Sequence, residues 1–194
     1  MTPSRAAGAL ALVPAVVLAV AGCSSTVTGN ASPGASAATG AIPGVQTSDY
    51  AAGQQHVVTS VDYPESPPVG GPHDGSWADC TGTVYDVDIR HENAVHSLEH
   101  GAVWVTYDPD ALSEDDVATL SALVSDIPYR FMSPYAGLDA PVSVQAWNRQ
   151  LEVDSADDPR LAAFADAFTQ DADNTPEDGA SCENPTFLAA PPTA

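Results

Sequence analysis

The spacing of apolar residues changes along the chain, and each spacing predicts a kind of element. Alternating or uninterrupted apolar positions predict strands at residues 56–61, 82–90, 102–107, 129–133 and 142–147. The last two segments are expected to form an antiparallel pair. Residues 62–80, rich in proline and glycine, predict a loop between the first two.

A helix is predicted after Ser113, because apolar residues recur three and four positions apart as far as Ile127. Ser113 is placed as its N-cap, and Asp116 stands where it would complete a weak capping box.

Two further segments predict helices. Residues 157–169 show the same apolar spacing, with Pro159 in the first turn. Residues 93–100 allow about two turns before Gly101, a natural helix stop. Because helices and strands interleave through short, mixed connections, we expect a single small α+β domain with a mostly antiparallel sheet and two or three helices.

The N-terminal region predicts export. Arg5 precedes an apolar run over residues 6–21, which is short for a membrane span and typical of a signal-peptide core. The run ends in Val-Ala-Gly-Cys at residues 20–23, which resembles a bacterial lipobox. We therefore expect a lipoprotein signal peptide over residues 1–22 and a diacylated Cys23, the alternative being an ordinary signal peptide with an incidental cysteine.

The rest of the chain divides by composition. Residues 23–48 are rich in serine, threonine, glycine and alanine, which predicts a flexible tether. The α+β domain is expected over residues 49–187 and a disordered tail over residues 188–194. Acyl chains on Cys23 would hold the protein on the extracytoplasmic face of the cell membrane, since each buried methylene contributes about 0.8 kcal/mol.

The chain is strongly acidic. Its 194 residues include 26 acidic residues against five arginines and no lysine, for a formal charge of −21. Loss of the first 22 residues would leave 172 residues and, without Arg5, a charge of −22. Nucleic-acid binding and attachment to bare anionic lipid are disfavoured because both need cationic side chains. A negative field instead attracts metal cations and basic partners, although the sequence indicates no particular protein partner.

Three cysteines allow a simple assignment. With Cys23 assigned to lipid, Cys80 and Cys182 remain as one pair in an oxidising compartment, so a disulfide is expected. It would join the C-terminal region to the early part of the domain and contribute up to ~4–5 kcal/mol on the chain-entropy estimate. The alternative is that the two thiols bind a metal ion.

Histidines are concentrated in one short segment. Three of the five in the chain fall within residues 91–100. His96 and His100 are four residues apart and share one helix face, and Glu99 completes the His-x-x-Glu-His pattern of inverted zinc proteases. Such a protease needs a longer helix than Gly101 allows, so a metal-dependent hydrolase is the least favoured function.

The same segment carries a family resemblance. AVHSLEHGAVWVTYDPD at residues 94–110 resembles the signature of the bacterial domain of unknown function 3105, whose members are exported or membrane-tethered. PPVGGPH at 67–73 is similar to its Pro-Pro-x-x-Gly-x-His segment, and APVSVQAWNR at 140–149 resembles its strand ending in Ala-Trp. Asn148 stands where the family usually has glycine. The resemblance implies no activity but directs attention to His73, His96, Glu99, His100 and Trp147.

We expect His73, His96 and His100 to form a binding site for zinc or copper, because neutral imidazoles suit both metals. Glu99 would orient one imidazole, and Met132 would supply a thioether that favours copper(I). No catalytic residue is assigned, and the protein is expected to be a binding module rather than an enzyme.

A metal-free alternative accounts for the same residues. His96 and His100 would hydrogen-bond loop carbonyls and pin the proline-rich segment over the short helix, while Glu99 would pair with Arg90 or Arg149. The protein would then be a scaffold or interaction protein of the cell envelope. The two remaining histidines, His56 and His91, are expected to be exposed or capping residues under either interpretation.

Overall fold

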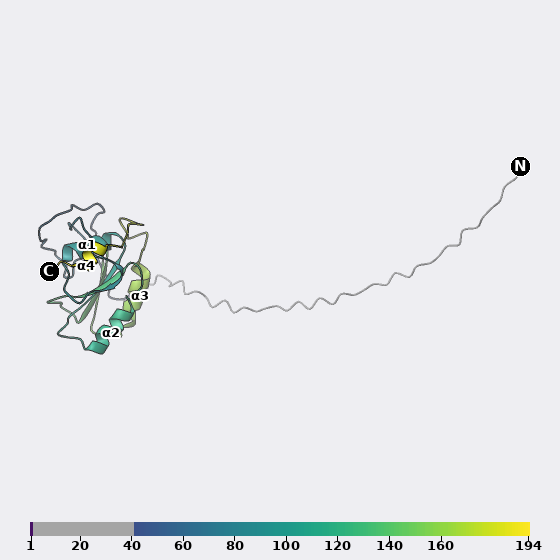
Figure 1. Cartoon of the computed structure of the whole chain (residues 1–194). Helices are drawn as coiled ribbons and strands as arrows, with labels where there is room; N and C mark the ends of the chain where they lie inside the picture. Colours follow the sequence, from purple (N-terminus) through teal and green to yellow (C-terminus); the bar gives the residue numbers. More distant parts are fainter. Residues whose placement is uncertain (2–40) are drawn as a thin grey trace. The chain divides into compact units, whose positions relative to one another are not determined.

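The structure is a computed structural model that describes Met1 and residues 41–194. Residues 2–40, including the predicted lipidation site Cys23, lie outside the described part. Figure 1 shows the domain formed by the described segment that ends at the C-terminus. Within the described residues, no helix has the length and apolar character needed to cross a membrane.

Six strands form one mixed sheet. In chain order they are β1 (Gln46–Thr47), β2 (Thr81–Val84), β3 (Val103–Tyr107), β4 (Arg130–Pro134), β5 (Val142–Ala146) and β6 (Arg149–Val153). The order across the sheet is β1-β6-β5-β3-β4-β2. β1 with β6, β6 with β5 and β5 with β3 are antiparallel, whereas β3 with β4 and β4 with β2 are parallel. The predicted α+β class with a mostly antiparallel sheet is therefore confirmed.

Helices lie on both faces of the sheet (Figure 1). α1 (His91–Glu99) and α4 (Pro185–Ala189) share a core cluster with Trp104 and Phe131. α2 (Glu114–Ala122) and α3 (Pro159–Phe168) share a second cluster with Val105 and Met132. Side chains alternate along a strand, so neighbouring residues of β3 and β4 enter different clusters.

Local signals place α2 and α3 as predicted at their N-termini. Ser113 Oγ accepts a hydrogen bond from the Asp116 amide at 3.2 Å, and Asp116 Oδ2 accepts one from the Ser113 amide at 3.1 Å, which completes the capping box. Pro159 occupies the first turn of α3. α2 ends at Ala122, before the predicted end at Ile127.

Three expectations about the strands were wrong. Segment 56–61 makes only an isolated bridge between His56 and His73. The strand expected over 82–90 ends at Val84, because the chain then leaves β4 and Ile89 forms a bridge with Thr193. β4 and β5 are not neighbours, because β3 lies between them and bonds to both.

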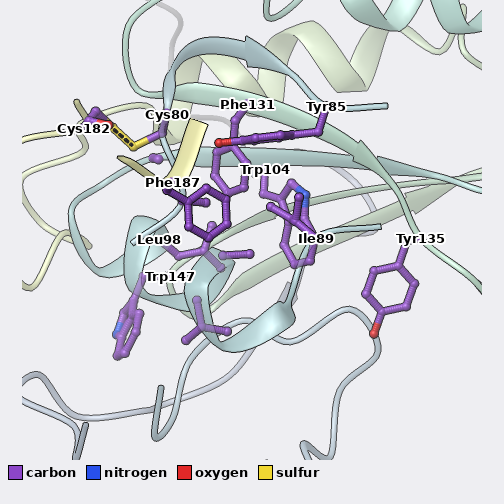
Figure 2. Packing of buried hydrophobic residues seen from close by; sticks show 14 residues of the cluster. Cys80, Tyr85, Ile89, Leu98, Trp104, Phe131, Tyr135, Trp147, Cys182 and Phe187 are labelled. Carbon is purple, nitrogen blue, oxygen red and sulfur yellow. Dashed lines mark hydrogen bonds between the residues drawn. A yellow bond between two sulfur atoms is a disulfide. The ribbon is translucent and has the colours of Figure 1, made fainter. Parts of the chain in front are cut away.

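The C-terminal region is attached to the early part of the domain. A disulfide joins Cys80 to Cys182, whose Cα atoms are 4.8 Å apart, and Figure 2 shows it beside Phe187 at the edge of the first core cluster. Residues 188–194, which we expected to be disordered, lie against residues 88–90. Here the Arg90 amide donates to the Pro192 carbonyl at 2.8 Å and the Ala194 amide to the Asp88 carbonyl at 3.0 Å.

Candidate metal centre

The end of α1 positions two of the predicted histidines. The Gly101 amide donates to the Leu98 carbonyl at 2.9 Å and the Ala102 amide to the Ser97 carbonyl at 3.0 Å, the pair of bonds that defines a Schellman motif. Gly101 has a φ of +88°, the left-handed conformation this motif requires at the position after the cap. His100 is therefore fixed as the helix C-cap, one turn beyond His96.

Each predicted ligand is fixed through its Nδ1 atom. Nδ1 lies 2.9 Å from the Gly71 carbonyl in His73, 2.7 Å from the Asp74 carbonyl in His96 and 2.8 Å from the Ser181 carbonyl in His100. A carbonyl oxygen only accepts hydrogen bonds, so Nδ1 must carry the proton. In each neutral ring Nε2 then keeps a free lone pair, which is the arrangement of metal-binding histidines.

A fourth histidine joins this group. The Val57 amide donates to the His73 carbonyl at 2.7 Å and the His73 amide to the Gln55 carbonyl at 3.2 Å, so the backbone holds His56 beside His73. Ring centroids are 5.1 Å apart for His56 and His73, 5.1 Å for His56 and His96, and 4.7 Å for His73 and His96. The bridge between His56 and His73 depends on contacts distant in sequence, so no spacing in the sequence indicates that His56 belongs to this group.

Glu99 meets His73 in the interior. Its Oε2 lies 3.0 Å from His73 Nε2, and its Oε1 accepts a hydrogen bond from the Gly53 amide at 3.1 Å. The exposed fraction is 0% for the His73 side chain and 1% for that of Glu99. Burial raises the pKa of Glu99, but a positively charged His73 that donates from Nε2, together with the Gly53 amide, outweighs it. In that protonation state of His73 the pKa of Glu99 lies below its ordinary value.

This contact leaves His73 Nε2 without a hydrogen bond of acceptable alignment. With the proton on Nδ1, a neutral His73 presents a lone pair to a carboxylate that also only accepts. Two buried acceptors in contact repel each other, and a cation between them would remove the repulsion. A second proton on His73 or a metal ion would supply that charge.

The candidate ligands form two groups that share one residue. His56, His73, His96 and Glu99 form the inner group, and His96, His100 and Glu177 form the outer group. Within each group one ligand atom per residue lies within 4.8 Å of all the others. Tetrahedral zinc with bonds of ~2.0–2.1 Å places its ligands about 3.3 Å apart, so small side-chain shifts would close either group around an ion.

Burial favours the neutral imidazoles that metals require. It lowers the pKa of His96 to about 4, an effect that the bond from Nδ1 to the Asp74 carbonyl only partly opposes. The pKa of His100 is lowered for the same first reason, with Glu177 acting against it. Both rings are therefore neutral at pH 7, the protonation state that binds zinc and copper.

The structure places His96 beside both His73 and His100, with ring centroids 4.7 and 4.6 Å apart. His73 and His100 fall in different groups, however, and not in the single three-histidine site that was expected. Met132 is a correction, because strand alternation directs it into the second core cluster, across the sheet from α1. His91 pairs with Asp88 at 3.1 Å and belongs to neither group. Trp147 approaches His73 with ring centroids 6.2 Å apart.

Part of the pinning interpretation is also present. His96 binds the carbonyl of Asp74 in the proline-rich loop, but His100 binds Ser181 in the C-terminal region instead. Glu99 contacts neither arginine proposed for it, and Arg90 pairs with Asp74 and Glu92. Because these bonds use only Nδ1, pinning and metal binding are compatible.

A comparison with protein families finds one match. The model of a family described as protein of unknown function (DUF3105) matches residues 55–184, more than half of the chain and a span that contains every member of both groups. No curated protein and no solved structure matches the chain.

Proposed function

The chain belongs to the DUF3105 family, and we propose that its domain is a binding module that holds one transition-metal ion, zinc or copper, in the inner group. The observation that carries the proposal is the buried contact between His73 Nε2 and the Glu99 carboxylate. In the interior, two facing acceptors cost free energy unless a proton or a cation lies between them.

The ligand set indicates the kind of ion. Three imidazoles and one carboxylate suit zinc and copper(II), whereas magnesium and calcium prefer an all-oxygen shell. Copper(I) prefers soft sulfur ligands, and Met132 lies in the other core cluster. We therefore expect a divalent ion rather than copper(I).

The proposal includes a location. The lipobox-like end of the apolar run supports acylation of Cys23, so the module would work on the extracytoplasmic face of the cell membrane. The acidic composition supports a cationic ligand over a nucleic acid.

Metal content tests the proposal directly. The chain from Ser24 onward, freed of metal and then given equimolar zinc or copper(II), should retain one equivalent after gel filtration, as measured by elemental analysis. Copper(II) should also quench the fluorescence of Trp147 and of Trp77, whose rings lie near those of His73 and His96.

His73→Ala should lose the bound ion. His91→Ala is the matched control, because it removes a histidine from α1 that belongs to neither group. Absence of retained zinc and copper in a correctly folded wild-type chain would instead favour the metal-free scaffold, supported by the Nδ1 hydrogen bonds.

A further inference from the structure

We propose that the ion reaches the inner group through the outer group, with His96 as the ligand that both positions share. The inference rests on the proposed function and adds a route for loading and release. His96, His100 and Glu177 would first capture the ion, which then exchanges His100 and Glu177 for His73 and Glu99 while His96 stays bound.

The shared residue restricts the chain to one ion at a time. His96 Nδ1 is used by the Asp74 carbonyl, so only the Nε2 lone pair is available to a metal. That lone pair binds one ion, and the two groups cannot both be complete. The His96 ring lies 4.7 Å from the His73 ring and 4.6 Å from the His100 ring, measured between centroids, so it is equally close to both positions.

Exposure gives the route its direction. The Glu177 side chain is 48% exposed, whereas His100 beside it is 4% exposed, and His100 Nε2 lies 3.4 Å from Glu177 Oε2. The inner pair, His73 and Glu99, is 0% and 1% exposed. An ion from solution can therefore meet a hydrated carboxylate first and lose its water as imidazoles replace it.

The backbone keeps the two positions together. The Glu177 amide donates to the Glu99 carbonyl at 3.0 Å, which attaches the outer carboxylate to the residue that carries the inner one. The Ser181 carbonyl holds His100 from the same C-terminal segment. Trp77 covers this side, with its ring centroid 5.0 Å from that of His100 and 5.6 Å from that of His96.

His56 offers a competing entrance. Its side chain is exposed and belongs to the inner group, so an ion could enter directly past it. The two routes differ in which residue controls the rate, and loading kinetics can separate them.

The test measures loading and removal in the chain from Ser24 onward. Copper(II) is mixed rapidly with the metal-free protein while tryptophan fluorescence is followed, and the ion is then withdrawn with excess EDTA. Glu177→Gln should slow both processes about 10- to 100-fold, the scale of losing one partner at a metal site. The number of ions bound should stay at one, because a route accelerates entry and exit alike.

Asp178→Asn is the matched control. It removes the same charge from the next residue along the chain, whose carboxylate belongs to neither group. It should load at the wild-type rate. His100→Gln provides a second outer variant and should behave as Glu177→Gln does.

The possible failures are distinct. Equal rates for Glu177→Gln and Asp178→Asn, or slowing only in His56→Ala, would overturn the route but leave the proposed function standing. Two equivalents bound at once would also overturn it, because His96 could not be shared. No bound copper or zinc in the wild type would overturn both proposals.

Discussion

At the scale of single residues, the charge balance between His73 and Glu99 decides how the metal-free protein behaves. The Gly71 carbonyl accepts a hydrogen bond from His73 Nδ1, so in the neutral ring Nε2 faces the carboxylate with a lone pair. A neutral ring gives repulsion, a doubly protonated ring gives a buried ion pair, and a metal ion satisfies both ligands. These states respond differently to an uncharged replacement of Glu99.

Glu99→Gln distinguishes a neutral His73 from a doubly protonated one. The Gln side chain can accept from the Gly53 amide through its oxygen and donate to His73 Nε2 through its nitrogen, which removes the repulsion. At pH 8 the metal-free variant should be more stable than the metal-free wild type by about 1 kcal/mol, the usual contribution of one hydrogen bond. It should also lose the bound ion. Urea unfolding with and without zinc measures both effects.

The control is His91→Ala, which should leave the stabilisation by zinc intact. If metal-free Glu99→Gln is instead less stable by several kcal/mol, the native contact is an imidazolium–carboxylate pair, which holds together without a metal ion.

The candidate ligands were predictable from the sequence where they lie on a single helix. The four-residue spacing of His96 and His100 gave their common face, but His56 came from a bridge between loops, which has no period. Met132 was wrongly assigned. The sequence predicts its strand but does not show which of the alternating side chains face α1. Asn148 has a φ of +60°, and its side chain hydrogen-bonds the backbone of Tyr50 at 2.7 and 2.9 Å.

At the scale of elements, local signals predicted helix ends and not strand partners. The capping box at Ser113 and the helix stop at Gly101 are both confirmed. Each depends only on a few adjacent residues, which the sequence shows directly. The insertion of β3 between β4 and β5 depends on contacts distant in sequence. The inner group depends on the same kind of contact, which explains why only some of its residues were predicted from the sequence.

Asp79 joins the start of β2 to the C-terminal segment. Its carboxylate accepts hydrogen bonds from the hydroxyl of Thr81 and from that of Thr83, each at 2.6 Å. It also accepts from the backbone amides of Thr81 at 3.1 Å and Asn184 at 2.8 Å. Burial opposes ionisation, but these donors prevail and lower the pKa of Asp79 below its ordinary 3.8. Its contribution to stability is therefore complete above pH 3.8 and is lost as the pH falls through the lowered pKa.

Asp79→Asn should lower the free energy of unfolding at pH 7 by about 1–3 kcal/mol, because an amide group would face the donors that the carboxylate accepts from. The variant should also lose less stability than the wild type between pH 4 and pH 2. Urea unfolding across this range, with the disulfide intact, measures both. Asp178→Asn, at an exposed position, should match the wild type, and an equal loss in the two variants would contradict the role of Asp79.

At the scale of the whole molecule, charge favours the delivery of cations. Within the described part of the chain, Arg90, Arg130 and Arg160 each pair with an aspartate, so they neutralise neighbours and leave the large acidic excess in place. The field of a chain with a formal charge of −21 raises the local concentration of divalent ions. Salt screens it, with a Debye length of about 10 Å at 0.1 M, so copper loading should slow as ionic strength rises.

Anchoring would place this field and the metal centre at the membrane surface, and it depends on Cys23, outside the described residues. We expect Cys23→Ala to abolish incorporation of labelled fatty acid in bacterial cells and to move the protein from the membrane fraction to the soluble fraction. Each acyl methylene contributes about 0.8 kcal/mol to membrane binding, so loss of the chains removes most of the affinity. Cys80→Ala with Cys182→Ala is the control, since it removes the disulfide thiols and should keep the label. Labelled protein that persists after Cys23→Ala would identify another site of acylation, and unlabelled protein that stays with the membrane would identify another kind of anchor.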